Sequence, residues 1–195
     1  MIDVYIINLT AVGIFGMILS AVFCDIRWTW KKNVVLIGAL ALILVFQGII
    51  YFRVDPDLVE SIYPLITHIP LIGLLCVLSG EYLWPIIAVL TAYLCCQLRR
   101  WLALLITAVF SGGFVMQNTA ELILTLPILL ILVYLVAPSV RSISHYPVSV
   151  KCQFGMVPAL YYGFDYLTRI YTSLLQEGRL VAIEFMPFVC SVAYL

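Results

Sequence analysis

The chain has 195 residues, of which 65% are hydrophobic and only 10% are Asp, Glu, Lys or Arg, and its formal net charge is zero. Water-soluble domains carry about 25% charged residues, so this composition, with a mean hydropathy of +1.15, excludes that class. The zero net charge argues against a nucleic-acid partner. We therefore expect the lipid bilayer to be the solvent of this protein.

The uncharged runs of the sequence are each about 15 to 20 residues long, the length at which a helix crosses hydrocarbon with its backbone groups paired internally. The runs are continuous rather than alternating, which excludes a closed β-barrel. The sequence thus predicts an all-α, polytopic transmembrane helix bundle of about seven helices, with six to eight as the range. The predicted spans are residues 4–24, 34–52, 62–78, 83–98, 101–116, 122–136 and 180–195. A more polar segment, 152–167, stays undecided.

Charged clusters set the expected ends of these spans. The acidic loop RVDPDLVE follows the second span, and Arg99 with Arg100 is expected to end the fourth. Basic residues in the first loop predict that this loop is cytoplasmic, so the protein is a multi-pass protein of the cell (plasma) membrane with its N-terminus outside and its C-terminus inside. With seven spans the same rule places Arg99 and Arg100 outside, as an exception or beside a re-entrant segment.

The first loop also carries indole rings among its basic groups. Such residues are typical of an interfacial membrane anchor, because cations meet lipid phosphates and indoles lie at headgroup depth. The anchor residues are Arg27, Trp28, Trp30, Lys31 and Lys32.

Neither end of the sequence looks like a processed terminus. Asp3 stands where a signal peptide has a basic region, so we expect residues 4–24 to be a permanent span. The chain stops at Leu195 inside a predicted helix, which predicts either a natural product that continues further or a truncated one. We find no Walker loop, GxGxxG or HExxH pattern, and the six cysteines show no CxxC spacing. We therefore predict no cofactor, no metal and no catalytic residue.

His68 is a polar residue inside an apolar span, between Pro64 and Pro70. Polar rings in a membrane usually face the bundle interior, where an interhelical hydrogen bond satisfies them. The functional interpretation is that His68, beside a helix distorted by two prolines, forms part of a ligand pocket or a pH-sensitive hinge.

Asp165 and Arg169 are four residues apart and can pair on one helical face. Four tyrosines accompany them as a predicted aromatic belt at the membrane surface, namely Tyr161, Tyr162, Tyr166 and Tyr171. The structural interpretation is an anchor helix lying in the interface. The functional one is an outer surface that docks a peptide.

Glu184 lies just inside the last predicted span, where a charge is expensive. A partner such as Arg179 would relieve that cost. The pair is either purely structural or couples rearrangement of the bundle to the terminal helix.

Four segments together resemble one known architecture: SIYPLITHIPL (61–71), TAYLCCQLRRW (91–101), ILTLPILLILVYLVAP (123–138) and the last 39 residues, VPALYYGFDYLTRIYTSLLQEGRLVAIEFMPFVCSVAYL (157–195). They look like the N-terminal membrane sensor of GHKL-type receptor histidine kinases of Gram-positive anaerobes, relatives of the Agr-type peptide-sensing kinases.

This resemblance implies that residues 1–195 are a single transmembrane sensor domain, non-enzymatic by itself. It implies a two-component, quorum-sensing type of signal transduction: an extracellular or membrane-borne cue, such as a peptide, would be detected by the bundle. The last helix would then act on a homodimer formed through a C-terminal part. The cytoplasmic phosphoacceptor and ATP-binding parts of that family are absent from these residues, and neither His68 nor His145 matches the phosphoacceptor.

Two other classes remain open. The stretch CDIRWTWKKN (24–33) is similar to the first Asp-containing loop of prepilin-peptidase-type membrane aspartyl proteases, which need two neighbouring carboxylates. Their second motif, Gly-x-Gly-Asp, is absent, because SGGF (111–114) has no acid. A small transporter or structural membrane subunit is the third class, since short helices broken by proline can line a substrate path.

Overall fold

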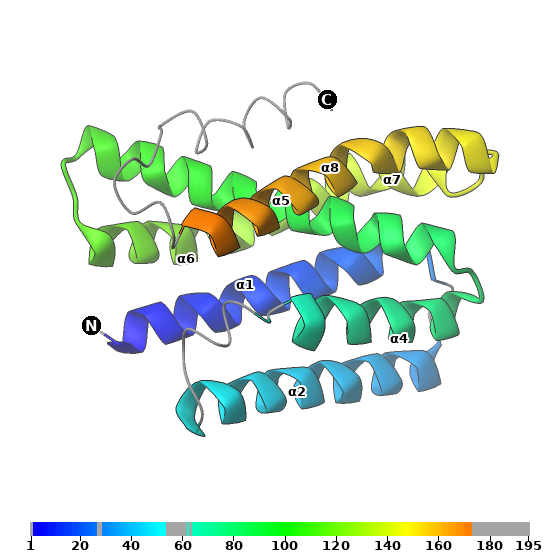
Figure 1. The fold of residues 1–195 in the computed structure, drawn as a ribbon, viewed down its shortest axis with the longest axis horizontal. Coiled ribbons are helices and arrows are strands. Elements are labelled where there is room, and N and C mark those ends of the chain that lie inside the picture. The colour runs from blue at the N-terminus through cyan, green and yellow to red at the C-terminus, as the bar shows by residue number, and fades with distance from the viewer. Residues whose placement is uncertain (1, 27–28, 54–61, 63, 173–195) are drawn as a thin grey trace.

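The computed structural model describes residues 2–26, 29–53, 62 and 64–172, and this part of the chain forms helices and no strand. Two of the nine helical elements found among these described residues are π-helices and are named η1 and η2, and Figure 1 labels the α-helices. In chain order the elements are α1 (Ile2–Phe23), α2 (Trp30–Arg53), η1 (Pro64–His68), α4 (Ile69–Ser79), α5 (Leu83–Val109), α6 (Phe114–Ile131), η2 (Leu132–Val136), α7 (Ala137–Ile143) and α8 (Val148–Thr172).

The long helices run alternately in opposite directions along the bundle, so most connections lie at its two ends, left and right in Figure 1. α5 is the central helix and packs against α1, α6 and α8. α2 lies at one edge, where it contacts α4, α1 and η1. Half of the residues in the most apolar 18-residue stretch of α5 are buried, whereas only 11% are buried in the corresponding stretch of α2. α2 therefore presents most of its surface to the surroundings of the bundle.

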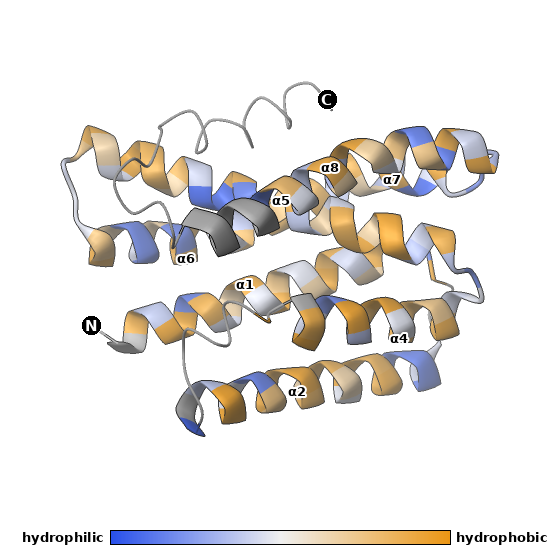
Figure 2. Cartoon of the chain, in the orientation of Figure 1, coloured by the Kyte–Doolittle hydropathy of each residue, from blue (hydrophilic) through white to orange (hydrophobic). Residues whose placement is uncertain are grey.

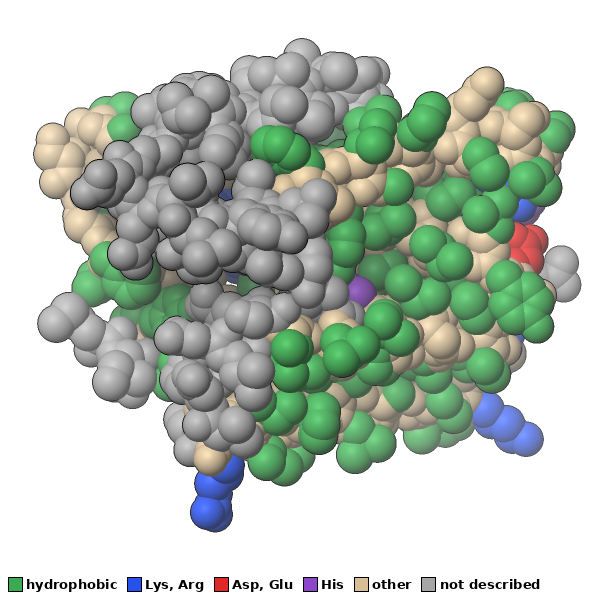
Figure 3. All heavy atoms as spheres, in the orientation of Figure 1, with side chains coloured by type: hydrophobic (Ala, Val, Ile, Leu, Met, Phe, Trp, Pro, Cys, Tyr) green, Lys and Arg blue, Asp and Glu red, His purple; other side chains and the backbone are tan. Residues whose placement is uncertain are grey.

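Four helices of the described part are long and apolar enough to cross a membrane: Val4–Phe23, Trp30–Tyr51, Leu83–Val109 and Phe114–Ile143. The all-helical, membrane-type fold class is therefore confirmed in its coarse form. Hydrophobic side chains predominate on the part of the face in Figure 3 that is not grey, and the hydropathy colours of Figure 2 put most hydrophilic residues near helix ends, apart from stretches inside α5 and α6. The expected number of about seven spans is not confirmed.

The prediction that Arg99 and Arg100 end a span is wrong. Residues 83–98 and most of 101–116 form the single helix α5, which continues to Val109. The sequence QLRRW contains no proline or glycine and consists largely of good helix formers, so nothing in the backbone interrupts the helix there. The tolerance of a charge at this depth is explained by the partners of Arg99, described below.

Other predicted spans also differ from the helices observed. From Pro64 onward the run predicted at 62–78 forms η1 followed by α4, and its apolar part, Leu65–Ser79, is shorter than the four long helices. The run predicted at 122–136 lies within a longer helical rod, Phe114–Ile143, that passes through η2. The undecided segment 152–167 belongs to α8, a helix of 25 residues. The span predicted at 180–195 lies outside the described residues.

The core between α1, α4 and α5 contains the largest fully buried side chains, among them Trp84, Phe15 and Phe23. One end of this core is closed by side chains that donate to helix carbonyls. The Trp84 indole donates to Phe23 O at 3.0 Å, the Arg141 Nε donates to Val22 O at 2.6 Å, and the Lys32 Nζ donates to Leu78 O at 2.7 Å. These bonds satisfy the carbonyls that the last turns of α1 and α4 leave unpaired.

Local sequence explains how the connecting turns form. α4 ends at Gly80, whose φ of 78° is the left-handed conformation that glycine adopts without steric cost, and its N–H donates to Cys76 O. α5 ends with a 2.9 Å bond from the Gly112 N–H back to Thr107 O, the long-range bond of a Schellman motif. Ser111, whose φ of 51° is left-handed, therefore turns the chain from α5 toward α6.

Candidate functional site

A cluster of one histidine and three tyrosines lies where η1, α5 and α8 meet. His68 Nδ1 and the Tyr162 hydroxyl are 2.8 Å apart and share a hydrogen bond. The His68 ring packs edge-on against Tyr93, with 5.3 Å between the ring centroids, and Tyr93 packs against Tyr162 at 4.8 Å and Tyr161 at 6.2 Å. We call His68, Tyr93, Tyr161, Tyr162 and Asp165 the histidine cluster. The predicted interhelical hydrogen bond of His68 is confirmed.

Asp165 belongs to this cluster because the Tyr93 hydroxyl donates a hydrogen bond to its carboxylate. The side chain of its predicted partner Arg169 lies outside the described residues. The expected interfacial belt of tyrosines is wrong for Tyr161 and Tyr162: Tyr161 is 3% exposed, and Tyr162 contacts the histidine. Their side chains face the bundle because α8 packs along α5.

The π-helical turn η1 explains how His68 reaches the cluster. Pro64 begins this turn and Pro70 follows it in the first turn of α4. Proline cannot donate the backbone hydrogen bond of a regular helix, and π-turns widen a helix and are frequent at functional sites. Two neighbours on the turn, Thr67 and His68, thus both find side-chain partners, since Gln47 of α2 donates to the Thr67 hydroxyl.

A second polar cluster holds α1, α5 and α6 together. The guanidinium of Arg99, 3% exposed, donates to Asn8 Oδ1 at 3.0 Å and to Thr125 Oγ1 at 2.9 Å, and forms a 3.3 Å ion pair with Glu121. Asn8 in turn donates to Glu121 and to Asn118, both at 2.9 Å. We call these five residues the arginine cluster. Each of them has at least one polar partner, and the formal charges cancel.

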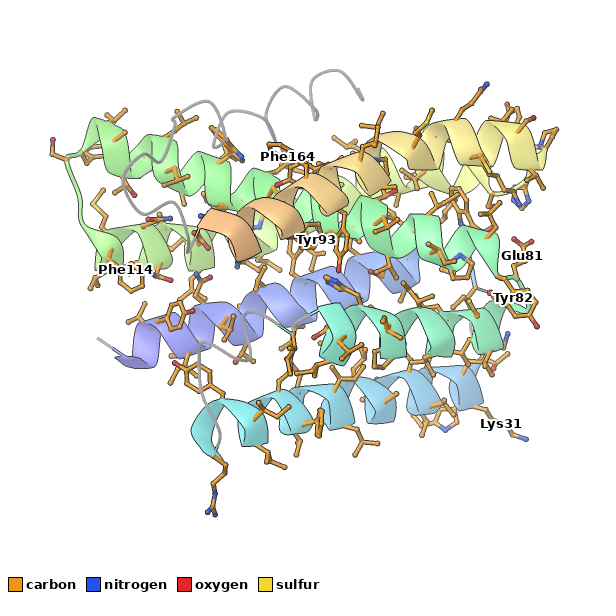
Figure 4. All side chains as sticks on the ribbon, in the orientation of Figure 1. Lys31, Glu81, Tyr82, Tyr93, Phe114 and Phe164 are labelled. Atoms are coloured by element: carbon orange, nitrogen blue, oxygen red, sulfur yellow. The ribbon has the colours of Figure 1, made fainter. Side chains whose placement is uncertain are left out.

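The two clusters lie at different positions along α5. Tyr93 is ten residues from Leu83, and Arg99 is sixteen, which corresponds to about 15 Å and 24 Å from the start of the helix. Because α5 ends at Val109, the two residues lie about 4.5 Å on either side of its middle, and Arg99 is the one nearer the end of the bundle where α1 begins. Figure 4 shows Tyr93 midway between Lys31, Glu81 and Tyr82 at one end and Phe114 at the other.

Sequence reasoning missed the arginine cluster. It took Arg99 for a loop residue, and gave no role to Asn8, Asn118, Glu121 or Thr125. The available signal was the spacing of Glu121 and Thr125, four residues apart on one face of an otherwise apolar helix, together with the uninterrupted helical sequence around Arg99.

A third group of polar residues surrounds the first loop. A hollow of about 90 Å³ is lined by Cys24, Asp25, Ser79, Glu81, Trp84, Ser144 and His145. His145 Nε2 is 3.4 Å from the Asp25 carboxylate. This volume is near that of three water molecules. Within the described residues no group of three or more potential ligands is placed to hold a metal ion.

The remaining predicted site residues are distributed as follows. Trp30 and Lys31 are exposed at this same end, as an anchor requires, while Lys32 reaches Leu78 O. Pro70 is exposed beside α2. Arg27, Trp28, Arg179 and Glu184 lie outside the described residues, so their predicted roles stay predictions.

The helices and the buried polar clusters point to a multi-pass, all-helical membrane protein. No family model matches the chain, and no curated protein or solved structure is similar to it. Any more specific function therefore depends on the physical chemistry of the clusters.

Proposed function

We propose that this protein is the membrane-embedded input domain of a signalling receptor, of the kind found in GHKL-type sensor histidine kinases. The observation that carries the proposal is the 2.8 Å bond between His68 on η1 and Tyr162 on α8. It links a proline-distorted segment, which can rearrange, to the helix that leads into the C-terminal part of the chain.

The mechanism is a shift between two packings of the bundle. A cue that binds one packing more tightly increases its population. In the described packing, η1 and α8 are connected through His68 and Tyr162, and α8 and α5 through Asp165 and Tyr93. Displacement of η1 breaks or weakens these contacts and allows α8 to tilt or rotate, and a downstream kinase dimer would read that motion.

The membrane orientation is part of the proposal. Described basic residues gather at the end formed by the connections 24–29, 79–82 and 144–147, with Lys31, Lys32, Arg141 and Lys151 near it. The positive-inside rule favours this end as cytoplasmic and the N-terminus as outside. The proposed cytoplasmic C-terminus depends on residues 173–195, outside the described part.

The test is a chimera in which a GHKL-type kinase half follows Leu195 in frame. Its autophosphorylation is measured in membrane vesicles over a dose series of the peptide fraction of spent culture medium. We expect a dose response in the parent, a flat response for His68→Ala, and a midpoint shifted at least about threefold for Tyr162→Phe. Tyr134→Phe is the matched control, because Tyr134 is 72% exposed on the outer surface of η2.

A parent chimera that never responds, or His68→Ala and Tyr162→Phe variants that respond like the parent at every dose, would overturn the receptor. A transporter is the second candidate, and the two π-turns in the bundle are the observation that favours it, because irregular helices line substrate paths. Solute uptake by the purified chain in proteoliposomes, lost in His68→Ala, would select it instead.

A further inference from the structure

An apolar groove runs between α2 and the η1–α4 segment, on the side of η1 that faces away from the histidine cluster. Its volume is about 420 Å³. Hydrocarbon side chains and a proline ring form its walls: Leu42, Ile43, Phe46, Ile50, Ile62, Leu65, Ile66 and Pro70. The groove exists because η1 and α4 contact α2 at few positions, and because Pro64 and Pro70 bracket an irregular turn.

The length of the groove along α2 matches the depth of one membrane leaflet, taking Trp30–Tyr51 as a membrane-spanning helix. Leu42 lies close to the middle of the apolar helix Trp30–Tyr51, and Ile50 lies eight residues further, which is about 12 Å along the axis. Half of the hydrocarbon thickness is about 15 Å. The groove therefore extends from the bilayer centre to the surface of the leaflet on the N-terminal side, parallel to the acyl chains of that leaflet.

The size and the charge at its mouth fit a lipid. If a methylene group takes about the 30 Å³ that a water molecule occupies, the groove holds a chain of about a dozen methylenes. Arg53 is exposed at the end of α2, one helical turn beyond Ile50, which is headgroup depth. Cationic side chains at this depth attract anionic lipid phosphates.

We propose that this groove binds one acyl chain of an anionic phospholipid from the N-terminal-side leaflet, with the phosphate on Arg53. Three consecutive residues connect the groove to the histidine cluster. Ile66 lines the groove, Thr67 accepts a hydrogen bond from Gln47 of α2, and His68 belongs to the histidine cluster. An occupied groove holds η1 against α5 and α8, and an empty one lets it relax toward α2. This coupling rests on the proposed receptor function; the lipid site does not.

The binding test uses the purified full chain in nanodiscs of phosphatidylcholine with a tenth of photoactivatable phosphatidylglycerol, its diazirine near the end of one acyl chain. Cross-linked residues are mapped by mass spectrometry. We expect labelling of groove residues around Leu42 and Leu65 at least about fivefold above that of Val45, which is 59% exposed on the neighbouring face of α2. Equal labelling around α2 would overturn the site.

Two matched variants sharpen the result. Leu42→Trp fills the groove from its rim, where Leu42 is 71% exposed, and should reduce groove labelling at least about fivefold, whereas Val45→Trp should leave it unchanged. Arg53→Gln should remove the preference for phosphatidylglycerol over a photoactivatable phosphatidylcholine. Equal losses in both tryptophan variants, an unchanged preference in Arg53→Gln, or labelling by a photoactivatable fatty acid alone would each contradict the proposal.

The outcomes separate the lipid site from the receptor function, because cross-linking is measured without any kinase output. Groove labelling with an unresponsive chimera leaves the site and removes the receptor. A responsive chimera with uniform labelling removes the site and leaves the receptor.

Discussion

The two buried polar clusters solve the same problem in different ways. The arginine cluster brings a full positive and a full negative charge inside the bundle, and five side chains from α1, α5 and α6 share their hydrogen bonds. The histidine cluster pairs an imidazole with a phenol and stacks aromatic rings, and its one described charge is the Asp165 carboxylate. The buried ion pair makes the first cluster expensive to disrupt, whereas in the second cluster the bond that joins η1 to α8 is a single hydrogen bond between an imidazole and a phenol.

This difference suggests a division of labour between the two halves of the bundle. A buried ion pair is strongly destabilised when one partner is removed, so α1, α5 and α6 should behave as one rigid unit. Interhelical hydrogen bonds between neutral groups in membranes contribute about 0.6 kcal/mol on average, so η1 and α8 can change their contacts at modest cost. A receptor needs both a fixed frame and a part that moves.

The largest effect should follow loss of one charge from the frame. Arg99→Ala leaves Glu121 buried without its ion-pair partner and should lower the free energy of unfolding by about 3–5 kcal/mol. Denaturant titration in mixed micelles measures it. Arg100→Ala is the control. Arg100 is exposed, so its loss should change the free energy of unfolding by less than about 0.5 kcal/mol. Equal losses for the two arginines would show that the cluster does not hold the frame.

Removing both charges should restore most of that stability. In Arg99→Met combined with Glu121→Leu, the ion pair is replaced by apolar groups of similar size, which is often neutral for buried pairs. We expect unfolding within about 2 kcal/mol of the parent, since Asn8 keeps Asn118 as a partner. If the double variant were as unstable as the sum of the single ones, hydrogen bonding rather than charge would dominate the cluster.

The histidine cluster should give a smaller and local effect. Tyr162→Phe removes one hydroxyl and should cost about 0.6–1.7 kcal/mol of unfolding free energy. In a double-mutant cycle, His68→Ala and Tyr162→Phe should be coupled, while Tyr162→Phe and Arg99→Ala should be additive within about 0.5 kcal/mol. If the coupling energy between the two clusters were as large as that within the histidine cluster, α1, α5 and α6 would not form a unit separate from η1 and α8.

The last prediction concerns which side of the membrane the basic end of the bundle faces, and its test leaves the stability of the protein unchanged. Cys152 is exposed near the start of α8, and burial raises the pKa of the Cys24 thiol to about 12, so Cys24 stays protonated and unreactive at pH 7. An impermeant maleimide should therefore label Cys152 in inverted vesicles and not in right-side-out ones, and Cys152→Ser should abolish this signal. The opposite sidedness would reverse the proposed orientation.

The position of His68 shows how far sequence reasoning reached. Its apolar surroundings and flanking prolines predicted an interior, satisfied ring, because an unpaired polar group is costly in hydrocarbon. The sequence could not identify Tyr162 as the partner, since 94 residues separate them and only the packing of α8 on α5 and η1 brings them together. Tyr161 and Tyr162 were misplaced for the same reason, because amphipathic composition suits both an interfacial helix and one packed in a bundle.

Arg99 shows where the method failed. A pair of arginines between two apolar runs is typical of a loop, and this interpretation prevailed although, with seven spans, it placed the pair outside against the positive-inside rule. The local sequence pointed the other way, because no proline or glycine interrupts the backbone near Arg99. The helix can therefore continue there, provided that the buried charge of Arg99 has a partner. The partners come from α1 and α6, 91 and 22 residues away, so no local pattern contained the answer.

The composition together with the length and continuity of the apolar runs indicated a helical protein of the membrane type, because apolar surface on this scale has to avoid water and its backbone has to pair internally. Tertiary structure decided which polar residues meet, how many apolar runs fuse into one helix, and where a groove opens between α2 and η1. Burial in a bilayer depends on average hydropathy, which a sequence states directly. Partnership between side chains depends on distances between helices, which exist only once the bundle has packed.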